Sequence, residues 1–156
     1  MTSRQDFFEF ILDHYENPRH RGILSAADVV MKGGNPGCGD VVTIYLRIDP
    51  ESQQIEDISF TGEGCTISQA AASLTMTKIQ GQTLAQVHTL RAQDILTDLG
   101  ESVLRTRRRC ATLALHTLRA ALTRYLQSHP GLPAPSSDAD EPALGLHFEP
   151  QPGTEE

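Results

Sequence analysis

A helical period opens the chain and predicts its first element. Ser3, which favours the N-cap position, precedes a stretch in which apolar residues recur three or four positions apart, and Asn17-Pro18 ends that stretch. We therefore expect a helix between these points, with one apolar stripe packed on the core. The stripe consists of Phe8, Ile11, Leu12 and Tyr15.

A period of two then predicts strands. In residues 41–48, VVTIYLRI, every second residue is Val, Ile or Leu, which is typical of a half-buried strand. Residues 49–52 have the composition of a turn, and residues 54–60 are the expected antiparallel partner. Residues 24–32 are a weaker strand candidate, because they lead into a glycine-rich turn.

Helical patterns return in the second half of the chain. A helix is predicted from Thr66 to about Gln80, because Thr66 and Gln69 fit a capping box and Gly81 fits a C-terminal stop. Three further helical stretches follow, at about 83–90, 93–99 and 110–127. Strands followed by helices predict an α+β fold: a small antiparallel three-stranded sheet packed by helices.

The composition changes after Gln127. Residues 128–156 hold six of the nine prolines and six acidic residues, and they contain no Lys or Arg. We therefore expect a metal-binding domain at 1–127 and a disordered, acidic, Pro-rich tail at 128–156. The formal net charge of −7 comes mostly from this tail, because the rest of the chain has 14 acidic and 13 basic residues. A nearly neutral domain argues against nucleic acid as a partner.

Targeting signals are not evident in the sequence. No run of about 18 apolar residues predicts a membrane helix, and the first residues, MTSRQDFFEF, do not resemble a signal peptide. We therefore expect a cytoplasmic protein with no membrane association. Three cysteines in a reducing compartment do not make a disulfide framework, so they are either isolated core residues or a functional set.

Each cysteine is expected at the boundary of an element. Cys38 lies in the turn NPGCGD, Cys65 follows a glycine-rich turn and starts a helix, and Cys110 starts the last helix. Helix N-termini favour the thiolate, which is the form that binds metals and attacks sulfur. Three thiolates and the Asp40 carboxylate would complete a tetrahedral zinc site, but the spacings match no zinc finger. An ordinary turn with an incidental cysteine therefore stays open at this point.

Three motifs around these cysteines resemble those of the IscU/SufU family of iron–sulfur assembly proteins, also called NifU N-terminal domains. The resemblance covers about residues 6–127. The motifs are NPGCGD at 35–40, GEGCTISQAAASLT at 62–75 and RRCATLAL at 108–115, and YENPRHRG at 15–22 fits the usual N-terminal segment.

The resemblance implies a SufE/IscU-like α+β sandwich with one exposed site near the sheet edge. There Cys38, Asp40, Cys65 and Cys110 would hold Zn²⁺ or a nascent cluster. The bend at 35–40 is expected to put Cys38 and Asp40 on one side of an exposed loop. A carboxylate is a harder donor than a thiolate, so Asp40 is the ligand expected to release most easily.

The family resemblance implies two different functions. IscU-type scaffolds have His before the third cysteine and a proline-containing segment upstream of it, whereas this chain has Arg109 and no proline in residues 102–110. Both departures favour a SufU-like, zinc-dependent acceptor of persulfide sulfur, with Cys38 as acceptor and a SufS/IscS-like cysteine desulfurase as partner. However, the 45-residue step from Cys65 to Cys110 leaves no room for the insertion that SufU proteins usually carry.

Two alternatives to the sulfur acceptor stay open. One is an IscU-like scaffold that assembles a transient [2Fe–2S] cluster and transfers it to downstream iron–sulfur assembly proteins, and the other is a structural zinc module that only mediates contacts. The chain is thus expected to be either a sulfurtransferase-type carrier or a non-enzymatic scaffold. Closed structural zinc sites usually use Cys and His, so Asp40 argues against the zinc module.

A basic cluster immediately precedes the third cysteine: Arg105, Arg107, Arg108 and Arg109. Such a cluster is often only the solvated start of a helix. Here we also expect it to dock an acidic patch of the desulfurase, because it adjoins the predicted site.

Overall fold

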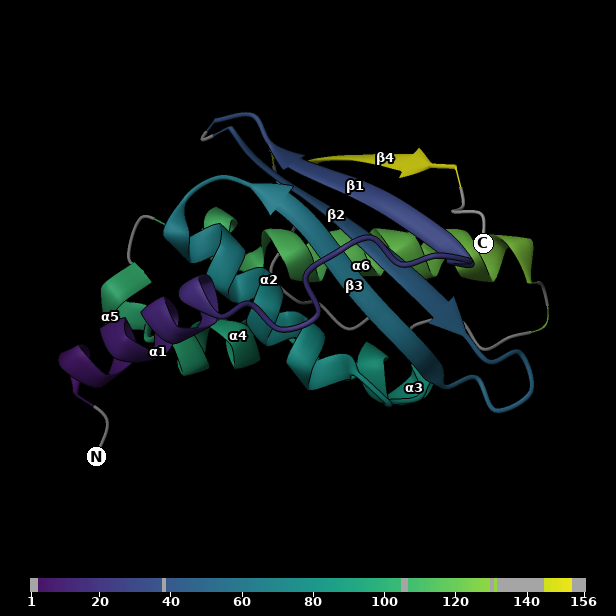
Figure 1. Ribbon diagram of the computed structural model, residues 1–156, viewed down its shortest axis with the longest axis horizontal. Coiled ribbons are helices and arrows are strands. Elements are labelled where there is room, and N and C mark those ends of the chain that lie inside the picture. The colour runs from purple at the N-terminus through teal and green to yellow at the C-terminus, as the bar shows by residue number, and fades with distance from the viewer. Residues whose placement is uncertain (1–2, 38, 105–106, 130, 132–144, 153–156) are drawn as a thin grey trace.

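The computed structural model contains one antiparallel sheet with the strand order β3-β2-β1-β4 (Figure 1). It describes residues 3–37, 39–104, 107–129, 131 and 145–152. The strands are β1 (Val29–Asn35), β2 (Asp40–Ile48), β3 (Ile55–Glu63) and β4 (His147–Gln151). The predicted α+β class is confirmed, but the expected number of three strands is wrong, since β4 is a fourth strand at the outer edge of β1.

The central strand β2 follows the predicted alternation. Val42, Ile44, Leu46 and Ile48 are all buried on the face that packs against the helices. The opposite face of the sheet has a smaller buried cluster, in which Tyr45 packs with Val30 and Ala27.

Strand β1 begins later than expected and extends further, through Gly33 and Gly34 to Asn35. Glycines usually weaken a strand, so the pattern suggested a turn at this point. Gly33 is required by packing, because a Cβ atom there would overlap the Thr117 hydroxyl of the last helix. Strand β3 likewise continues through Gly62 to Glu63, beyond the predicted end at Phe60.

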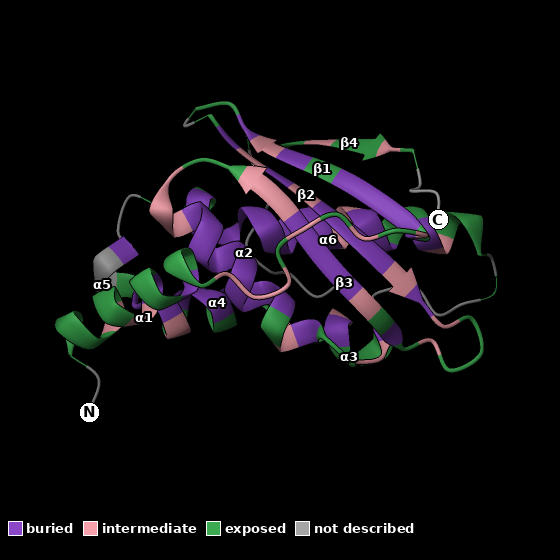
Figure 2. Ribbon diagram, viewed as in Figure 1, coloured by how far each residue is buried: buried purple, intermediate pink, exposed green. Residues whose placement is uncertain are grey.

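Six helices complete the described fold: α1 (Arg4–Glu16), α2 (Thr66–Ile79), α3 (Leu84–His88), α4 (Ala92–Leu99), α5 (Glu101–Leu104) and α6 (Arg108–Ser128). Helices α2 and α6 lie against one face of the sheet and are largely buried, and α1 and α4 pack on this layer from outside (Figures 1 and 2). The predicted helices at 83–90, 93–99 and 110–127 correspond to α3, α4 and α6, and α5 was not predicted.

The apolar stripe predicted for α1 is mostly wrong. Ser3 caps the helix as expected, but Phe8, Leu12 and Tyr15 are 43%, 46% and 41% exposed. The buried face of α1 contains Ile11 and His14, and it packs on α2. When a helix has apolar residues on more than one side, its sequence does not indicate which side packs on the core.

Burial of His14 has an electrostatic consequence. Its Nδ1 lies 2.8 Å from the Ser73 hydroxyl of α2, and the backbone N–H of Arg19 donates to the same hydroxyl at 2.8 Å. Desolvation by burial, assisted by the nearby Arg19 charge, lowers the pKa of His14. This network fixes the chain after α1 against α2.

The outer sides of β3 and β1 are both paired. At the β3 edge, the backbone N–H of Gly22 donates to Phe60 O at 2.8 Å, and Phe60 N–H donates to His20 O at 2.9 Å. At the other edge, β4 pairs with β1. Part of the segment predicted to be disordered is therefore a strand, whereas residues 132–144 lie outside the described residues, so the proposed division at 127/128 stays a prediction. Within the described residues, no helix has the length and apolar character needed to cross a membrane.

Candidate metal centre

The turn that precedes β2 places Asp40 at the start of that strand. Asn35 and Asp40 are paired across the β1–β2 hairpin, and Gly39 N–H donates to Asn35 O at 2.8 Å. Gly39 has φ +75°, a conformation that favours glycine. The Asp40 side chain is only 1% exposed, so the expectation of a carboxylate on an exposed loop is wrong. Cys38 lies outside the described residues.

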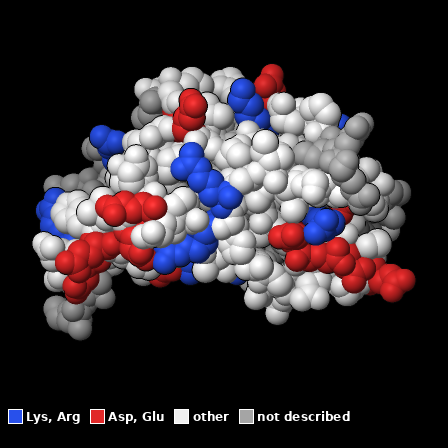
Figure 3. Space-filling view, viewed as in Figure 1, with Lys and Arg blue, Asp and Glu red and all other residues white. Residues whose placement is uncertain are grey.

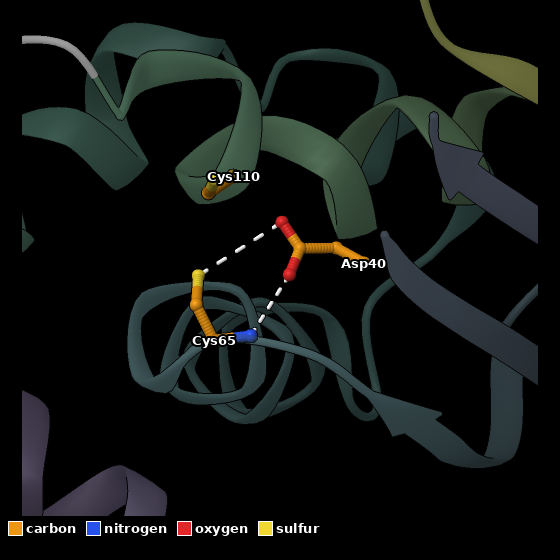
Figure 4. Close-up of side chains that lie close together, drawn as sticks. All are labelled: Asp40, Cys65 and Cys110. Atoms are coloured by element: carbon orange, nitrogen blue, oxygen red, sulfur yellow. Dashed lines mark hydrogen bonds between the residues drawn. The ribbon is translucent and has the colours of Figure 1, made fainter. Parts of the chain in front are cut away.

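Asp40 is held in place by the start of α2. The backbone N–H of Cys65 donates to Asp40 Oδ1 at 2.8 Å, and Cys65 Sγ lies 3.9 Å from Asp40 Oδ2 (Figure 4). Gly64 has φ +147°, and a Cβ atom at this position would overlap Asp40 Oδ1. The second glycine of GEGC therefore provides the space in which the carboxylate lies.

Cys65 itself is the N-cap of α2. Its Sγ accepts the Ser68 N–H at 3.4 Å, so the predicted capping box of Thr66 and Gln69 is wrong by one residue. Thiols are poor N-caps compared with hydroxyls or carboxylates, which is why sequence rules did not select Cys65. The position nevertheless points the sulfur toward Asp40.

Cys110 completes the described group from the opposite side. It is buried in the first turn of α6, and one ligand atom from each of Asp40, Cys65 and Cys110 lies within 4.8 Å of the others (Figure 4). The three residues come from the start of β2 and the starts of two helices. The predicted convergence of these three positions is therefore present in the structure, whereas that of Cys38 stays a prediction.

The donor set suits a tetrahedral zinc ion. With Zn–S bonds of about 2.3 Å, neighbouring sulfur ligands are about 3.8 Å apart, so the observed spacing needs shifts of under about 1 Å. A buried carboxylate next to two sulfurs is costly without a cation, because burying an unpaired charge is unfavourable. The partial positive charges at the N-termini of α2 and α6 also favour anionic ligands there. The arrangement can hold a metal ion through three described ligands, and a tetrahedral site would need one more.

Two further buried side chains adjoin this centre and were not selected from the sequence. Asn35 is buried at the base of the turn, and neither of its side-chain polar atoms has a hydrogen-bond partner within the described part of the chain. Gln69 is buried one helical turn after Cys65, and its Oε1 also has no partner there. The sequence suggested that Asn35 is an ordinary turn residue, because it does not show that the side chain is buried.

The predicted arginine cluster is only partly described. Arg107, Arg108 and Arg109 are exposed, and Arg108 forms an ion pair with Glu101 at 3.4 Å, whereas Arg105 lies outside the described residues. Elsewhere, on the face shown in Figure 3, basic side chains are scattered among acidic ones.

Comparison with known proteins agrees with this geometry. Residues 7–130 match the family described as NifU-like N terminal domain. The iron–sulfur cluster assembly scaffold protein IscU of Aquifex aeolicus (strain VF5) is 34% identical over 121 residues, covering 78% of this chain and 76% of that protein. The zinc-dependent sulfurtransferase SufU of Bacillus subtilis (strain 168) is 40% identical, but over 74 residues that cover 47% of this chain and 48% of that protein.

A solved structure supports the same assignment. It is described as an iron–sulfur cluster assembly scaffold protein for the SUF system from Fervidobacterium islandicum AW-1, and it has 28% sequence identity and a TM-score of 0.64. The superposition covers 77% of this chain and 99% of that chain. The resemblance inferred from the three cysteine motifs is therefore confirmed: the chain belongs to the NifU-like N-terminal domain family, the IscU/SufU family of iron–sulfur cluster assembly proteins.

Proposed function

We propose that this protein accepts persulfide sulfur from a cysteine desulfurase on Cys38, at a Zn²⁺ site formed by Cys38, Asp40, Cys65 and Cys110. The observation that carries the proposal is the cluster of Asp40 with two cysteine sulfurs, in which no described histidine takes part. The residue before Cys110 is Arg109, which stays protonated and cannot bind zinc. This donor set favours a SufU-like acceptor over an IscU-like scaffold.

The sulfur transfer is a thiol–persulfide exchange. Bound Zn²⁺ would keep the cysteine sulfurs in the thiolate form. The Cys38 thiolate attacks the outer sulfur of the desulfurase persulfide, a new S–S bond forms, and the old S–S bond breaks with the desulfurase cysteine leaving as a thiolate. Cys38 then carries the transferred sulfur, and pyridoxal phosphate chemistry belongs to the partner.

In the proposed site, Cys38 is the ligand that leaves, although a carboxylate is the harder donor, because Asp40 is buried and hydrogen-bonded. Cys65 and Cys110 are fixed on helices, and Asp40 is held by the Cys65 N–H and the space beside Gly64. Cys38 lies between β1 and β2 in a connection of four residues. Its release therefore disrupts neither a helix nor the Asp40 contacts.

A scaffold that assembles and transfers a [2Fe–2S] cluster is the second candidate. It is favoured by the long match to an IscU scaffold and by the 45-residue step from Cys65 to Cys110, which lacks the usual SufU insertion. A purely structural zinc module is the least favoured function, because Asp40 replaces the Cys or His of closed structural sites.

Docking of the desulfurase is proposed to involve the exposed arginines before Cys110, together with Arg105. We expect Arg109→Glu to weaken the partner's association several-fold at low salt, and less so at high salt, since surface charges are screened. Arg124→Glu is the matched control, because Arg124 is exposed near the other end of α6. Equal effects of both variants would contradict the docking proposal.

The test of the proposed function is the stimulation of a cysteine desulfurase, measured as alanine release with and without this protein. Cys38→Ser should keep the fold and abolish stimulation, whereas wild-type protein should carry about one Zn²⁺ per chain. If Cys38→Ser still accepts sulfur and Cys110→Ser does not, the acceptor is Cys110 and the scaffold becomes the better proposal.

A second variant separates the two leading functions. In Asp40→Ala, a sulfur acceptor should lose zinc affinity and desulfurase stimulation, and the protein should stay colourless after anaerobic reconstitution with iron and sulfide. A scaffold that loses its hard, labile oxygen ligand should instead retain a coloured cluster for longer and transfer it poorly. Absorbance and a chelator competition distinguish the two outcomes.

A further inference from the structure

The strand β4 lies outside the part of the chain that matches the family, which ends at residue 130. It pairs antiparallel with β1 from Val30, opposite Gln151, to Gly34, opposite His147. The edge of β1 would otherwise present unpaired backbone N–H and C=O groups, a template for another strand. A segment beyond the matched region thus covers the β1 edge (Figure 1).

Two apolar side chains anchor this segment. Leu146 and Phe148 are half-buried and pack against the main core, and β4 also contacts α6. His147 and Glu149 are exposed, and Glu149 lies opposite the exposed Lys32 of β1. Leu146 and the five-residue strand after it contribute only two partly buried apolar side chains, so we expect this segment to dock weakly compared with β2 or β3.

The segment also lies next to the metal centre at one end. Its last pair with β1, at Gly34, is one residue from Asn35, which pairs with Asp40. Gly145 has φ +78°, and a Cβ atom there would be 2.8 Å from a guanidinium nitrogen of Arg109, the residue before Cys110. The docked segment therefore restrains the base of the NPGCGD turn and covers part of Arg109.

The connection favours docking within the same chain. Residues 129–144 are 16 residues long, enough to span about 50 Å when extended, and α6 is about 32 Å long. A connection of this length holds the segment at an effective concentration on the order of 1 mM. Weak intrinsic binding is then sufficient for occupancy. A connection of 16 residues is also longer than the short hinges that promote exchange between copies.

We propose that the outer edge of β1, with the adjacent surface of α6, is a strand-docking site that binds extended segments of the pattern Leu-x-Phe. The chain's own residues 145–151 occupy it reversibly. Release of the segment exposes the β1 edge and loosens the turn that carries Cys38. This inference is independent of the metal and of the proposed sulfur transfer.

The experiment weakens the docking of residues 145–151 by replacing Phe148, and then adds the same segment as a separate peptide. The variant is Phe148→Asp, and the control is His147→Asp, which puts the same charge on the exposed face of the same strand. The probe is a fluorescent peptide of residues 144–152, compared with the same peptide carrying Leu146→Asp and Phe148→Asp. Anisotropy measures binding, and hydrogen exchange by NMR measures protection of the β1 amides that face β4.

We expect those amides to exchange at least about tenfold faster in the Phe148→Asp full-length protein, and not in the control, since a charge replaces a partly buried ring. Gly39 should also exchange faster. The peptide should bind Phe148→Asp and restore protection, whereas wild-type protein and the altered peptide show no binding.

Four results would overturn the proposal or a part of it. Unchanged β1 exchange in Phe148→Asp, or failure of the peptide to bind it, shows that the edge is not a docking site. Loss of the whole fold in both Phe148→Asp and the milder Phe148→Ala shows that β4 is an integral part of the core and does not exchange. Unchanged exchange at Gly39 excludes the restraint on the turn.

Discussion

Gly64→Ala tests the geometry of the metal centre directly. A methyl group there would overlap Asp40 Oδ1, and the φ of +147° is a strained conformation for alanine. The backbone strain is worth about 1–3 kcal/mol. Displacing the carboxylate also breaks its hydrogen bond from Cys65 N–H, worth about 1.5–3 kcal/mol for a charged acceptor. We therefore expect a loss of roughly 2.5–6 kcal/mol in the free energy of unfolding.

Gly22→Ala is the matched control. Gly22 has φ +144°, nearly the same as Gly64, and a Cβ atom there would meet nothing within 4 Å. It should cost only the strain of about 1–3 kcal/mol and leave zinc affinity unchanged. Gly64→Ala should lower zinc affinity about 10- to 100-fold, as expected when a ligand loses its supporting hydrogen bond.

Urea unfolding in the presence of a chelator gives the stabilities, and competition with a chromogenic chelator gives the zinc affinities. In the Asp40→Ala background, most of the extra cost of Gly64→Ala over Gly22→Ala should disappear with the carboxylate. A small excess should stay, because the Cβ atom would still lie 3.0 Å from the Cα atom of residue 40. Equal zinc affinities of Gly64→Ala and Gly22→Ala would refute the claim that Gly64 positions Asp40.

Three further predictions concern residues around the same core. Cys65→Ser should keep α2 capped, because Ser is a good N-cap, but the variant should lose bound zinc. Cys110→Ser should also lose zinc, and it should lose about 1–3 kcal/mol of stability because it buries a hydroxyl. Metal analysis and urea unfolding check both variants. The pKa of His14 is held below its usual 6.5. The contribution of neutral His14 to stability should therefore be full above pH 6.5 and should decline as the pH falls toward the lowered pKa. Urea unfolding at several pH values should show this dependence in the wild type and not in His14→Gln. Gly33→Ala should destabilise the protein by about 1–3 kcal/mol through overlap with Thr117, and adding Thr117→Ala should restore part of the loss in thermal unfolding.

Local periodicity was sufficient for the elements whose burial is unambiguous. The alternation in β2 and the helical pattern of α6 each match one type of element, so strand and helix were predicted close to their observed bounds. Neither pattern predicted that residues 110–118 are all buried or that Tyr45 packs on the opposite face of the sheet. In α1 the sequence offers more than one apolar face, and packing on α2 selects the one with Ile11 and His14. That selection depends on contacts far apart in sequence, which periodicity does not contain.

The fourth strand shows a related limit. His147–Gln151 includes a proline and is surrounded by acidic and Pro-rich sequence, which favours disorder. Its pairing depends on the free edge of β1, more than a hundred residues earlier in the chain. The composition of a segment does not show whether a distant strand edge is available to pair with it.

The candidate site was predictable in its residue types and not in its geometry. The motifs indicated Asp40, Cys65 and Cys110 as one group, which the structure brings together. The burial of Asp40 and the space provided by Gly64 arise where the start of β2 meets the end of β3. Contacts between strands determine both features, so the sequence alone suggested an exposed loop.

The most direct test of the central claim is mass spectrometry of peptides after a single turnover with a cysteine desulfurase and cysteine under anaerobic conditions. The account predicts one added sulfur atom on the peptide that contains Cys38, reversible by a reducing thiol, while the zinc content stays at about one per chain and the protein stays colourless. An unmodified Cys38 peptide, together with a coloured iron–sulfur cluster when iron is supplied, would contradict it.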